Sequence, residues 1–536
     1  MGGLLFGWDT GQIADLMIMQ DFKRRFASKD PGNPDHYVWN MWIQGLIVGF
    51  LSIGAMVGPF LGAPASDRFG RRWSIAFGCV VFTVGLIIQV ASQYSWVQLG
   101  IGRFIVGVSV GWLSASVPVY QSETLPRQVR GAMVGMYQLF ITIGILLSYC
   151  CCYGTKGYMS SDGSFSSAQW RVPIAVGFAW GIILGVGIMF CPESPRWLGK
   201  RGRFDEMKKV LARMRGVDAS NEFVLSEFYD IKKEVLDEMQ AEKKGWIDCF
   251  RTENKTLYRT ILGIALQTGQ QLTGANYFFY YGATIFQSVG ISDSVVTQII
   301  LGAVNTGTTF PGLWALDRFG RRICLLVGSA WMAMWLLIFA TAGVAGKPIR
   351  FVPGGEGVTN PDAPADPESI GTLMICSACF FILAFASTWG PGIWTLISET
   401  CAPQTRAKQY AIATLGNWTW NFCIGFFTPP ITNNIHFNYG YIFMGCNVAN
   451  FFLVYFFVYE TFNLTLEAAN DMYLDPNCKP WNSAKWVPPG YTSRPGFKAN
   501  VEKELENLSN ATGALPNSDN ASETKDDGLM IRTSTP

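Results

Sequence analysis

Four amide side chains lie close together in a stretch that is otherwise apolar and aromatic. Residues 267–282 read Gln-Thr-Gly-Gln-Gln-Leu-Thr-Gly-Ala-Asn-Tyr-Phe-Phe-Tyr-Tyr-Gly, within an apolar run that begins near Leu257. A buried amide without a hydrogen-bond partner costs roughly 2–7 kcal/mol, so polar residues at membrane depth usually face a bundle interior or a wet cavity. Amides donate and accept hydrogen bonds, and aromatic rings offer apolar faces. Together these groups suit a ligand with many hydroxyls and C–H bonds, such as a sugar.

The positions of the amides predict a break in the helix that carries them. On a regular helix Gln271 and Asn276 would point about 140° apart. Gly269 and Gly274 are positions at which the helix can be interrupted, and interrupted helices line the central sites of many transporters. The alternative is that the amides only bond between helices, as polar residues do in membrane bundles. The number of amides and glycines in one segment favours a binding site.

The composition is that of an integral membrane protein. Of 536 residues, 49% are hydrophobic and 15% are charged, whereas about a quarter of the residues are charged in soluble domains. The net charge of +2 gives no electrostatic footprint for nucleic acid. Thirteen cysteines and two histidines form neither a disulfide framework nor a metal-ligand pattern. We therefore expect a lipid bilayer around the chain, and no metal, cofactor or nucleic-acid partner.

Twelve apolar segments have about the 20-residue length that a membrane helix needs. They are expected near residues 1–20, 41–65, 73–92, 96–121, 131–153, 171–191, 258–287, 294–316, 323–345, 371–398, 409–433 and 437–459. The first segment starts without a polar leader, and we expect that its beginning is truncated. The pattern predicts an N-terminal half (1–191), a cytosolic helical linker (192–257), a C-terminal half (258–459) and a cytosolic, largely disordered tail (460–536).

Basic residues near the ends of the spans predict the orientation of the chain. The loops that contain Arg68, Arg127, Arg318 and Arg406 are expected in the cytosol, whereas the loops at 92–95, 287–294 and 433–439 contain no Lys or Arg. The Lys-Arg-Arg run at 23–25 breaks the pattern, because it falls in an external loop. The majority of the loops predicts that both termini are cytosolic.

A charged motif occurs once in each half. Asp-Arg-Phe-Gly-Arg-Arg at 67–72 recurs at 317–322, and Ser-Glu-Thr at 122–124 recurs at 398–400. Equivalent loops carry each pair, which predicts two six-helix halves related by duplication. The positive-inside rule explains the arginines but not acids at fixed offsets. We hypothesise a cytosolic gate, a charge network that latches the halves together, formed by Asp67, Arg71, Glu123, Arg130, Asp317, Arg321, Glu399 and Arg406.

Several of these segments resemble one known family. Residues 270–276 (Gln-Gln-Leu-Thr-Gly-Ala-Asn), followed by Tyr280 and Tyr281, resemble the seventh-helix signature of the sugar porter family of the major facilitator superfamily. Residues 192–198 (Pro-Glu-Ser-Pro-Arg-Trp-Leu) resemble the motif after its sixth helix, and the resemblance extends from Gly2 to about Tyr473. Fungal hexose transporters are the most similar members. The family's closing motif departs here at 462–463, where Phe-Asn replaces Lys-Gly, and Ala407 replaces a glycine.

The resemblance implies an all-α membrane protein with twelve transmembrane helices in two six-helix halves, the major facilitator fold, with a cytosolic helical region between them. It also implies a sugar-binding site. The positions that match the family's sugar contacts are Gln138, Gln270, Gln271, Asn276, Tyr280, Asn305, Trp394 and Asn417. Taken alone, each of the positions outside the seventh span is as readily a packing residue.

Asp9 and Arg103 are the intramembrane charges that point to proton coupling. Charges at membrane depth are rare, and proton relays are one of their uses. Proton-coupled sugar porters have an aspartate and an arginine at the matching positions. Fungal hexose facilitators, however, share the Trp-Asp-Thr-Gly context of residues 8–11. The sequence therefore leaves proton symport and facilitated diffusion open.

The sequence as a whole predicts transport of a hexose such as glucose by alternating access, by a multi-pass monomer in the plasma membrane. Nothing in it suggests an enzyme, because no nucleophile–base or metal constellation is present. The alternative is a sugar sensor that keeps the transporter fold but signals. The short tail after Glu460 favours a carrier, since fungal sensors often have a long cytosolic tail, whereas the altered closing motif favours a sensor.

Overall fold

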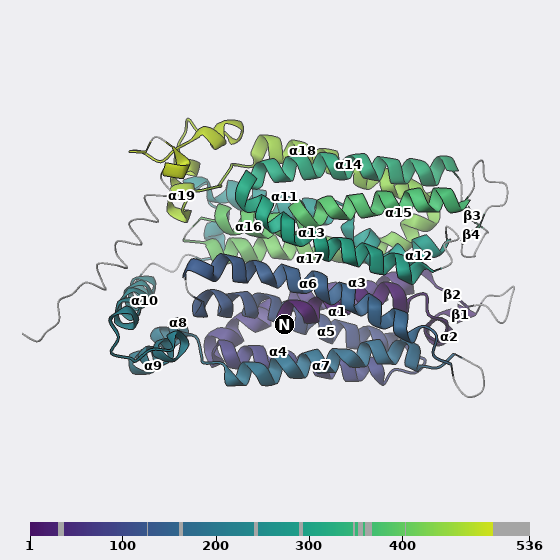
Figure 1. Cartoon of the computed structure of the whole chain (residues 1–536), viewed down its shortest axis with the longest axis horizontal. Helices are drawn as coiled ribbons and strands as arrows, with labels where there is room; N and C mark the ends of the chain where they lie inside the picture. Colours follow the sequence, from purple (N-terminus) through teal and green to yellow (C-terminus); the bar gives the residue numbers. More distant parts are fainter. Residues whose placement is uncertain are drawn as a thin grey trace, which may run out of the picture.

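A computed structural model describes most of the chain. It covers residues 1–29, 37–125, 127–159, 165–240, 245–288, 293–346, 349–351, 357–359, 367–402, 404–491 and 493–496. Two helical bundles lie side by side (Figure 1). The first contains α1 (Gly2–Leu16), α3 (Met41–Phe69), α4 (Arg71–Val90), α5 (Trp96–Thr124), α6 (Arg127–Thr155) and α7 (Ala168–Phe190).

The second bundle has the same number of spans, but two of them are interrupted. It contains α11 (Thr256–Gln271) with α12 (Ala275–Ser288), α13 (Ser294–Phe319), α14 (Arg321–Gly346), α15 (Pro367–Ala384) with α16 (Gly390–Thr400), α17 (Arg406–Ile435) and α18 (Tyr439–Phe457). A π-helical turn, η3 (Phe385–Trp389), joins α15 to α16. The all-α fold predicted from the sequence is confirmed.

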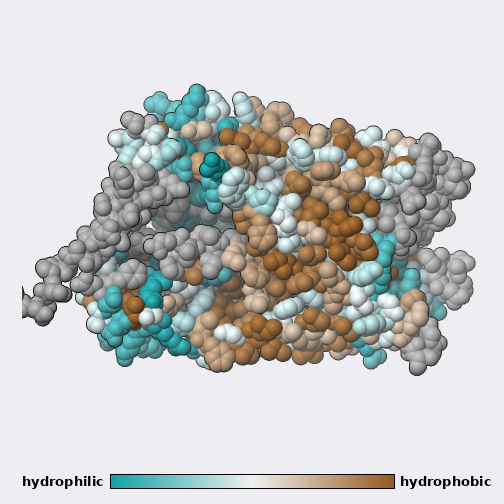
Figure 2. Space-filling model, in the orientation of Figure 1, coloured by the Kyte–Doolittle hydropathy of each residue, from teal (hydrophilic) through white to brown (hydrophobic). Residues whose placement is uncertain are grey.

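The twelve expected spans correspond to these helices. Nine helical stretches of the described residues are long and apolar enough to cross a membrane, and one of them, 408–457, contains both α17 and α18. The other two spans are α1, which has 15 residues, and the interrupted pair α11 and α12. Figure 2 shows apolar surface over the middle of the bundle and hydrophilic residues toward its ends. Exposed Phe60, Phe190 and Trp314 belong to this apolar surface, which is the surface that a bilayer would cover.

The two halves meet along three helix pairs, α3 with α17, α6 with α13, and α1 with α12. Small residues allow these close contacts, as they do in other membrane bundles. A Cβ at Gly45 of α3 would lie 2.2 Å from the carbonyl oxygen of Phe426 on α17. A Cβ at Gly302 of α13 would lie 3.0 Å from the ring of Tyr149 on α6. Substitution of Gly45 would therefore push the halves apart, whereas substitution of Gly302 would require a small shift of the Tyr149 ring.

Short elements gather at the two ends of the bundle. At one end lie α8 (Pro195–Lys200), α9 (Phe204–Arg215), α10 (Glu222–Gln240) and α19 (Leu466–Leu474) (Figure 1). The first three pack around Leu198, Met207 and Leu211, which confirms the helical region expected between the halves. At the other end lie α2 (Gln20–Phe26) and the paired strands β1 (Ser28–Lys29) with β2 (Tyr37–Val38), and β3 (Ile349–Phe351) with β4 (Gly357–Thr359).

The beginning of the expected tail is folded. After α19 the chain forms η5 (Pro480–Lys485), and Arg494 inserts its guanidinium beneath these turns with 7% of the residue exposed. Its Nη1 donates to the carbonyl oxygens of Glu460 and Phe462, each over 3.1 Å. Its Nε donates to the carbonyl of Trp486 over 2.7 Å. One buried arginine thus ties residues 460–494 together, and residues 497–536 lie outside the described part of the chain.

Candidate functional site

The seventh span is broken where the sequence predicts a break. Helix α11 ends at Gln271 and α12 begins at Ala275. Gly274 between them has a φ of +95°, a conformation that glycine adopts without steric cost. Because of this break the side chains of Gln271 and Asn276 meet, and Asn276 Nδ2 donates to Gln271 Oε1. The predicted interruption of the helix is confirmed.

The amides of α11 converge on Asn417 of α17. Gln271 Nε2 donates to Asn417 Oδ1 over 2.8 Å. Asn417 Nδ2 in turn donates to Gln267 Oε1 and, over 2.9 Å, to Gln270 Oε1. These four residues are buried, whereas Asn276 is partly exposed. We call the five residues the amide cluster; it is a connected network with one accessible member.

The interrupted tenth span contributes backbone acceptors to the amide cluster. Gln270 Nε2 donates to the carbonyl oxygens of Trp389 and Gly390, each over 2.9 Å. Both carbonyls lie where the π-helical turn η3 meets α16, and π-helical turns occur often at functional sites. The Trp389 indole is fully buried and donates to the Leu325 carbonyl over 3.0 Å. Trp389 therefore holds the acceptor in place through its own side chain.

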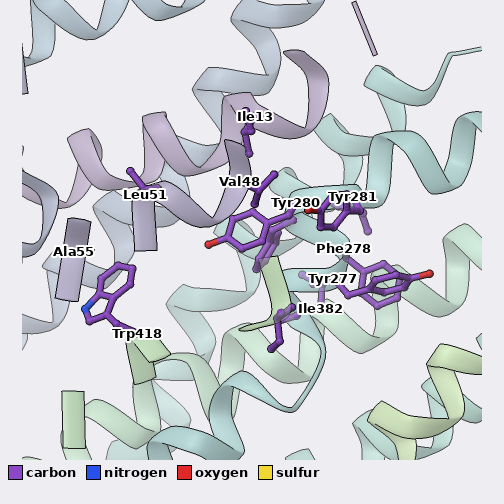
Figure 3. Packing of buried hydrophobic residues seen from close by; sticks show 14 of the residues in the cluster. Ile13, Val48, Leu51, Ala55, Tyr277, Phe278, Tyr280, Tyr281, Ile382 and Trp418 are labelled. Atoms are coloured by element: carbon purple, nitrogen blue, oxygen red, sulfur yellow. The ribbon is translucent and has the colours of Figure 1, made fainter. Parts of the chain in front are cut away.

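A second set of polar contacts joins the two halves beside the amide cluster. Tyr280 Oη donates to Asn421 Oδ1 over 2.9 Å, and Ser52 Oγ of α3 donates to the same oxygen over 2.5 Å. Figure 3 shows Tyr280 and Tyr281 close to Val48 of the first half. Asn421 follows Asn417 by one helical turn, so the i, i+4 spacing on one face is the signal by which sequence analysis could have found it.

The other three expected sugar contacts lie outside the amide cluster. Gln138 is half-buried on α6, and Asn305 is buried on α13, which packs against α6. Among the described residues neither side chain bonds to the cluster. Trp394 packs its ring against Tyr410, with the centroids 6.1 Å apart. Hydrogen bonds therefore join Gln270, Gln271, Asn276 and Asn417, and Tyr280 bonds to Asn421 one helical turn from Asn417. Gln138, Asn305 and Trp394 stay predicted sugar contacts.

Asp9 and Arg103 lie close to each other inside the first half. Asp9 is 0% and Arg103 1% exposed. Arg103 Nη1 lies 3.7 Å from Asp9 Oδ2, while Arg103 Nε donates to the Ile47 carbonyl over 2.8 Å. Gln12 Nε2 donates to Asp9 Oδ1 over 3.0 Å. Within the described part of the chain, Asp9 Oδ2 and Arg103 Nη2 have no hydrogen-bond partner. The two charges thus attract each other without a direct hydrogen bond.

Comparison with known proteins identifies the family. A family model described as "Sugar (and other) transporter" matches residues 1–473. This chain belongs to that sugar transporter family. It is 44% identical over 502 residues to a low-affinity glucose transporter of Kluyveromyces lactis, covering 94% of this chain and 85% of that protein. It is 43% identical over 487 residues to the hexose transporter HXT10 of Saccharomyces cerevisiae, covering 91% and 86% respectively.

Two solved structures of a xylose transporter have a similar fold. The inward-open xylose transporter XylE from E. coli superposes with a TM-score of 0.69 at 24% identity, covering 88% of this transporter and 97% of that chain. The proton:xylose symporter XylE bound to 6-bromo-6-deoxy-D-glucose gives a TM-score of 0.68 at 25% identity, with the same coverage. The resemblance noted in the sequence, the major facilitator fold and the expectation of a transporter rather than an enzyme are therefore confirmed.

The charged motifs of the transporter form one network in each half. In the first half Arg71 Nε and Nη2 donate to the two oxygens of Glu123 over 2.9 and 3.0 Å, and Nη1 lies 2.9 Å from Asp67 Oδ1. In the second half Arg321 Nη2 lies 3.1 Å from Glu399 Oε1 and 3.3 Å from Asp317 Oδ1. All these pairs join residues of the same half.

The hypothesised gate has two further members, Arg130 and Arg406. The side chain of Arg130 lies outside the described residues. Arg406 is half-buried, and its Nε has no hydrogen-bond partner among the described residues. In this conformation the described pairs therefore stabilise each half internally, rather than latching one half to the other.

Two glutamates that sequence analysis missed complete these networks. Glu193 accepts hydrogen bonds from the backbone N–H groups of Arg71 and Arg72 at the start of α4. Glu460 accepts from those of Arg321 and Arg322 at the start of α14, each over 3.0 Å. A carboxylate at a helix N-terminus satisfies free N–H groups and complements the helix dipole.

The altered closing motif, with Phe-Asn in place of Lys-Gly at 462–463, is compatible with the charge network of the second half. Asn463, which replaces the family's glycine, has a φ of +59°, and asparagine is one of the few residues that tolerates this conformation. Thr461 Oγ1 donates to Glu399 Oε2 over 2.6 Å, as Ser194 Oγ donates to Glu123 Oε2 in the first half. The two halves therefore have matching charge networks despite the altered sequence.

Proposed function

We propose that this transporter carries a hexose such as glucose across the membrane by alternating access, and that the amide cluster recognises the sugar. The hexose and glucose transporters among its relatives support this substrate class. The observation that carries the proposal is the convergence of Gln270, Gln271, Asn276 and Asn417 at the break between α11 and α12.

The amide cluster supports sugar recognition because its bonds can be exchanged. A hydroxyl donates and accepts hydrogen bonds, so it can replace the Asn276–Gln271 bond without leaving either amide unpaired. Asn276 is the partly exposed member, and it is therefore the first that a sugar would meet. An analogue without the hydroxyl leaves buried amides unpaired, which makes such sites selective. The proposed substrate contacts are Gln138, Gln270, Gln271, Asn276, Tyr280, Asn305, Trp394 and Asn417.

The contacts between the halves support alternating access. The halves touch along α1 with α12, α3 with α17 and α6 with α13, whereas the described charge networks hold each half together. We propose that each half moves as a body and that the charged residues stabilise its cytosolic end. The proposed gate residues are Asp67, Arg71, Glu123, Arg130, Asp317, Arg321, Glu399 and Arg406.

Proton symport is the coupling that we propose, with Asp9 and Arg103 as the coupled pair. Burying an ion pair costs several kcal/mol, and Asp9 has one oxygen without a hydrogen-bond partner among the described residues. Protonation of Asp9 would release Arg103, so the pair can change charge state during the cycle. One structural neighbour is a proton:xylose symporter. Facilitated diffusion is the alternative outcome.

The remaining proposals concern the cellular context. The chain is a multi-pass membrane protein. We propose that it functions as a monomer in the lipid bilayer of the plasma membrane, with both termini in the cytosol. The basic loops of the sequence and the position of α8, α9, α10 and α19 at one end of the bundle support this orientation (Figure 1).

Uptake of labelled glucose by cells that lack their own hexose carriers tests the proposed function. Expression of this chain should restore uptake, unlabelled hexose should compete, and a proton uncoupler should abolish accumulation above the external concentration. Uptake that equilibrates but never accumulates would replace symport by facilitated diffusion. A correctly inserted protein that restores no uptake would refute hexose transport.

A further inference from the structure

Asp15 is a buried acid that the sugar site and the Asp9 pair do not use. It lies near the end of α1 and is 0% exposed. Within the described part of the chain, neither of its carboxylate oxygens has a hydrogen-bond partner. A buried carboxylate without partners is costly, and such a group binds a proton unless a cation comes close.

An ion pair near Asp15 joins the two halves. Lys156 follows α6 in the first half, and Asp293 precedes α13 in the second. Lys156 Nζ contacts Asp293 Oδ2, and the two side chains are 36% and 33% exposed. Gln169 at the start of α7 donates to the Lys156 carbonyl, whereas α8 follows the other end of α7. The pair therefore lies at the end of the bundle opposite α8, which is the external end in the proposed orientation. Separation of the halves at this end would break it.

Asp15 and Asp293 both interact with the charge of Lys156. The two carboxylates also repel each other. The other titratable groups that interact with Asp15 come from α6, and they are the Tyr149 phenol and the thiols of Cys150 and Cys152. None of these groups is cationic. Lys156 is therefore the cation for which the two carboxylates compete.

The remaining helices that pack against α1 direct their charged groups elsewhere. Arg103 of α5 pairs with Asp9, and Tyr280 of α12 interacts with Asp9 and Arg103. Arg171 of α7 donates to the carbonyl of Ser92 over 3.0 Å. None of these groups replaces Lys156 as a partner of Asp15.

We propose that Asp15 is a proton-binding site, which is filled when the external end closes and emptied when it opens. In the closed arrangement Asp293 of the opposite half holds Lys156, and the Asp15 carboxylate takes up one proton from solution. When the halves part, Asp293 moves away, Lys156 pairs with Asp15, and Asp15 releases that proton to the external solution. This inference rests on the proposed alternating access, but it does not require a particular sugar.

The exchange of partners makes the external end sensitive to pH. At low pH Asp15 keeps its proton, so Lys156 stays with Asp293 and the closed arrangement is favoured. At high pH the Asp15 carboxylate competes for Lys156, and the open arrangement is favoured. This site is distinct from Asp9, because the cation beside Asp9 is Arg103 and comes from the same half.

Hydrogen exchange measured by mass spectrometry on the purified, sugar-free chain tests the proposal. The readout is the exchange rate of backbone amides in the external ends of α6 and α13, compared between variants at the same pH. At pH 7.5 Asp15→Asn should lower the rate about fivefold, the upper range for one partly solvated ion pair. At pH 5.5 the variant and the unmodified chain should agree within about twofold.

Three further variants serve as controls for the test. Asp293→Asn should raise exchange at both pH values, since it removes the partner that closes the external end. Asp15→Glu should keep the pH dependence, because it preserves the competing carboxylate. Cys150→Ser, which alters a neighbouring non-cationic group, should also leave it unchanged.

The outcomes that would overturn the proposal differ from those that refute hexose transport. Equal exchange in Asp15→Asn and the unmodified chain at both pH values would overturn it, as would a difference independent of pH. If Asp15→Asn fails to fold, unchanged exchange in Asp293→Asn would overturn it instead. A chain that carries no hexose but shows the predicted exchange would refute the proposed substrate and leave the Asp15 site standing.

Discussion

The Asn276 amide donates a hydrogen bond to Gln271 across the break between α11 and α12. A continuous helix would point these two side chains in different directions. The break therefore divides one polar span into two shorter helices, α11 and α12, whose polar side chains face a common site. Hydrogen bonds also explain why three buried glutamines are tolerated in this apolar span, because each bonds to another amide or to a backbone carbonyl.

The partly exposed amide should dominate sugar affinity. Asn276→Ala is expected to raise the KM for glucose uptake about tenfold or more, because it removes a bond to the sugar and leaves Gln271 with an unpaired group. Kinetic uptake assays with surface expression measured in parallel check this. Asn434→Ala is the matched control, since among the described residues that amide bonds to the Pro430 carbonyl of its own helix. Equal KM values for both variants would assign the amides a purely structural role.

The glycine at the break should be required for folding. Gly274→Ala would place a Cβ 2.8 Å from the Phe443 ring at a φ of +95°, at a cost of roughly 1–3 kcal/mol from backbone strain alone. We expect a lower melting temperature for the purified protein. Gly154→Ala is the control, because a Cβ there meets nothing within 4 Å. A Gly274→Ala protein that melts with the unmodified chain would contradict the importance of the break.

The charge networks should act within their own halves. Arg321→Ala is expected to increase hydrogen exchange where α14 begins and α16 ends, because Glu399 loses its cation. Arg71→Ala should do the same for α4 and α5. The expected loss of local stability is about 1–3 kcal/mol, since each acid is left partly buried. Equal loosening of both halves by either variant would indicate a latch between them.

Proton coupling should depend on Asp9. Asp9→Asn fixes a neutral side chain beside Arg103, so the pair can no longer change charge state. Uptake against a gradient should disappear, while exchange of labelled for unlabelled sugar survives. The unmodified chain should alkalinise the medium during uptake, and more acidic medium should increase accumulation. Parallel losses in both assays, without alkalinisation by the unmodified chain, would favour a facilitator in which Asp9 only positions Arg103.

Features that depend on neighbouring residues could be predicted from the sequence, because their physical causes lie within one short segment. Gly269, Gly274 and the amides between them indicated the broken helix, and apolar length indicated twelve spans. The repeated Asp-Arg-Phe-Gly-Arg-Arg motif indicated two related halves. In each case the signal is a pattern of polarity or flexibility within about 30 residues of sequence.

Features that depend on contacts between residues far apart in the chain could not be predicted from the sequence. Glu193 and Arg71 are 122 residues apart along the chain, and only the folded helices bring the carboxylate to the N-terminus of α4. The same pattern of charges fits a network within a half and a latch between halves, and the position of each helix decides between them. The Trp389 carbonyl accepts a hydrogen bond from Gln270, 119 residues away along the chain, and no local pattern in the sequence predicts this contact.

The polar tail shows that average composition does not predict every ordered segment. Its composition indicates disorder, because few apolar residues can offset the entropy of ordering it. The buried guanidinium of Arg494 nevertheless organises the segment through carbonyl oxygens of Glu460, Phe462 and Trp486. One side chain with five donors thus provides order that average composition does not register.

Direct binding of labelled glucose to the purified chain tests the central claim most closely, because it separates recognition from transport. The unmodified chain should bind glucose, and unlabelled glucose should displace the label. Gln271→Ala and Asn417→Ala should each weaken binding about tenfold or more, with Asn434→Ala unchanged. Glucose binding of equal strength in all four proteins would contradict the assignment of the amide cluster as the hexose site.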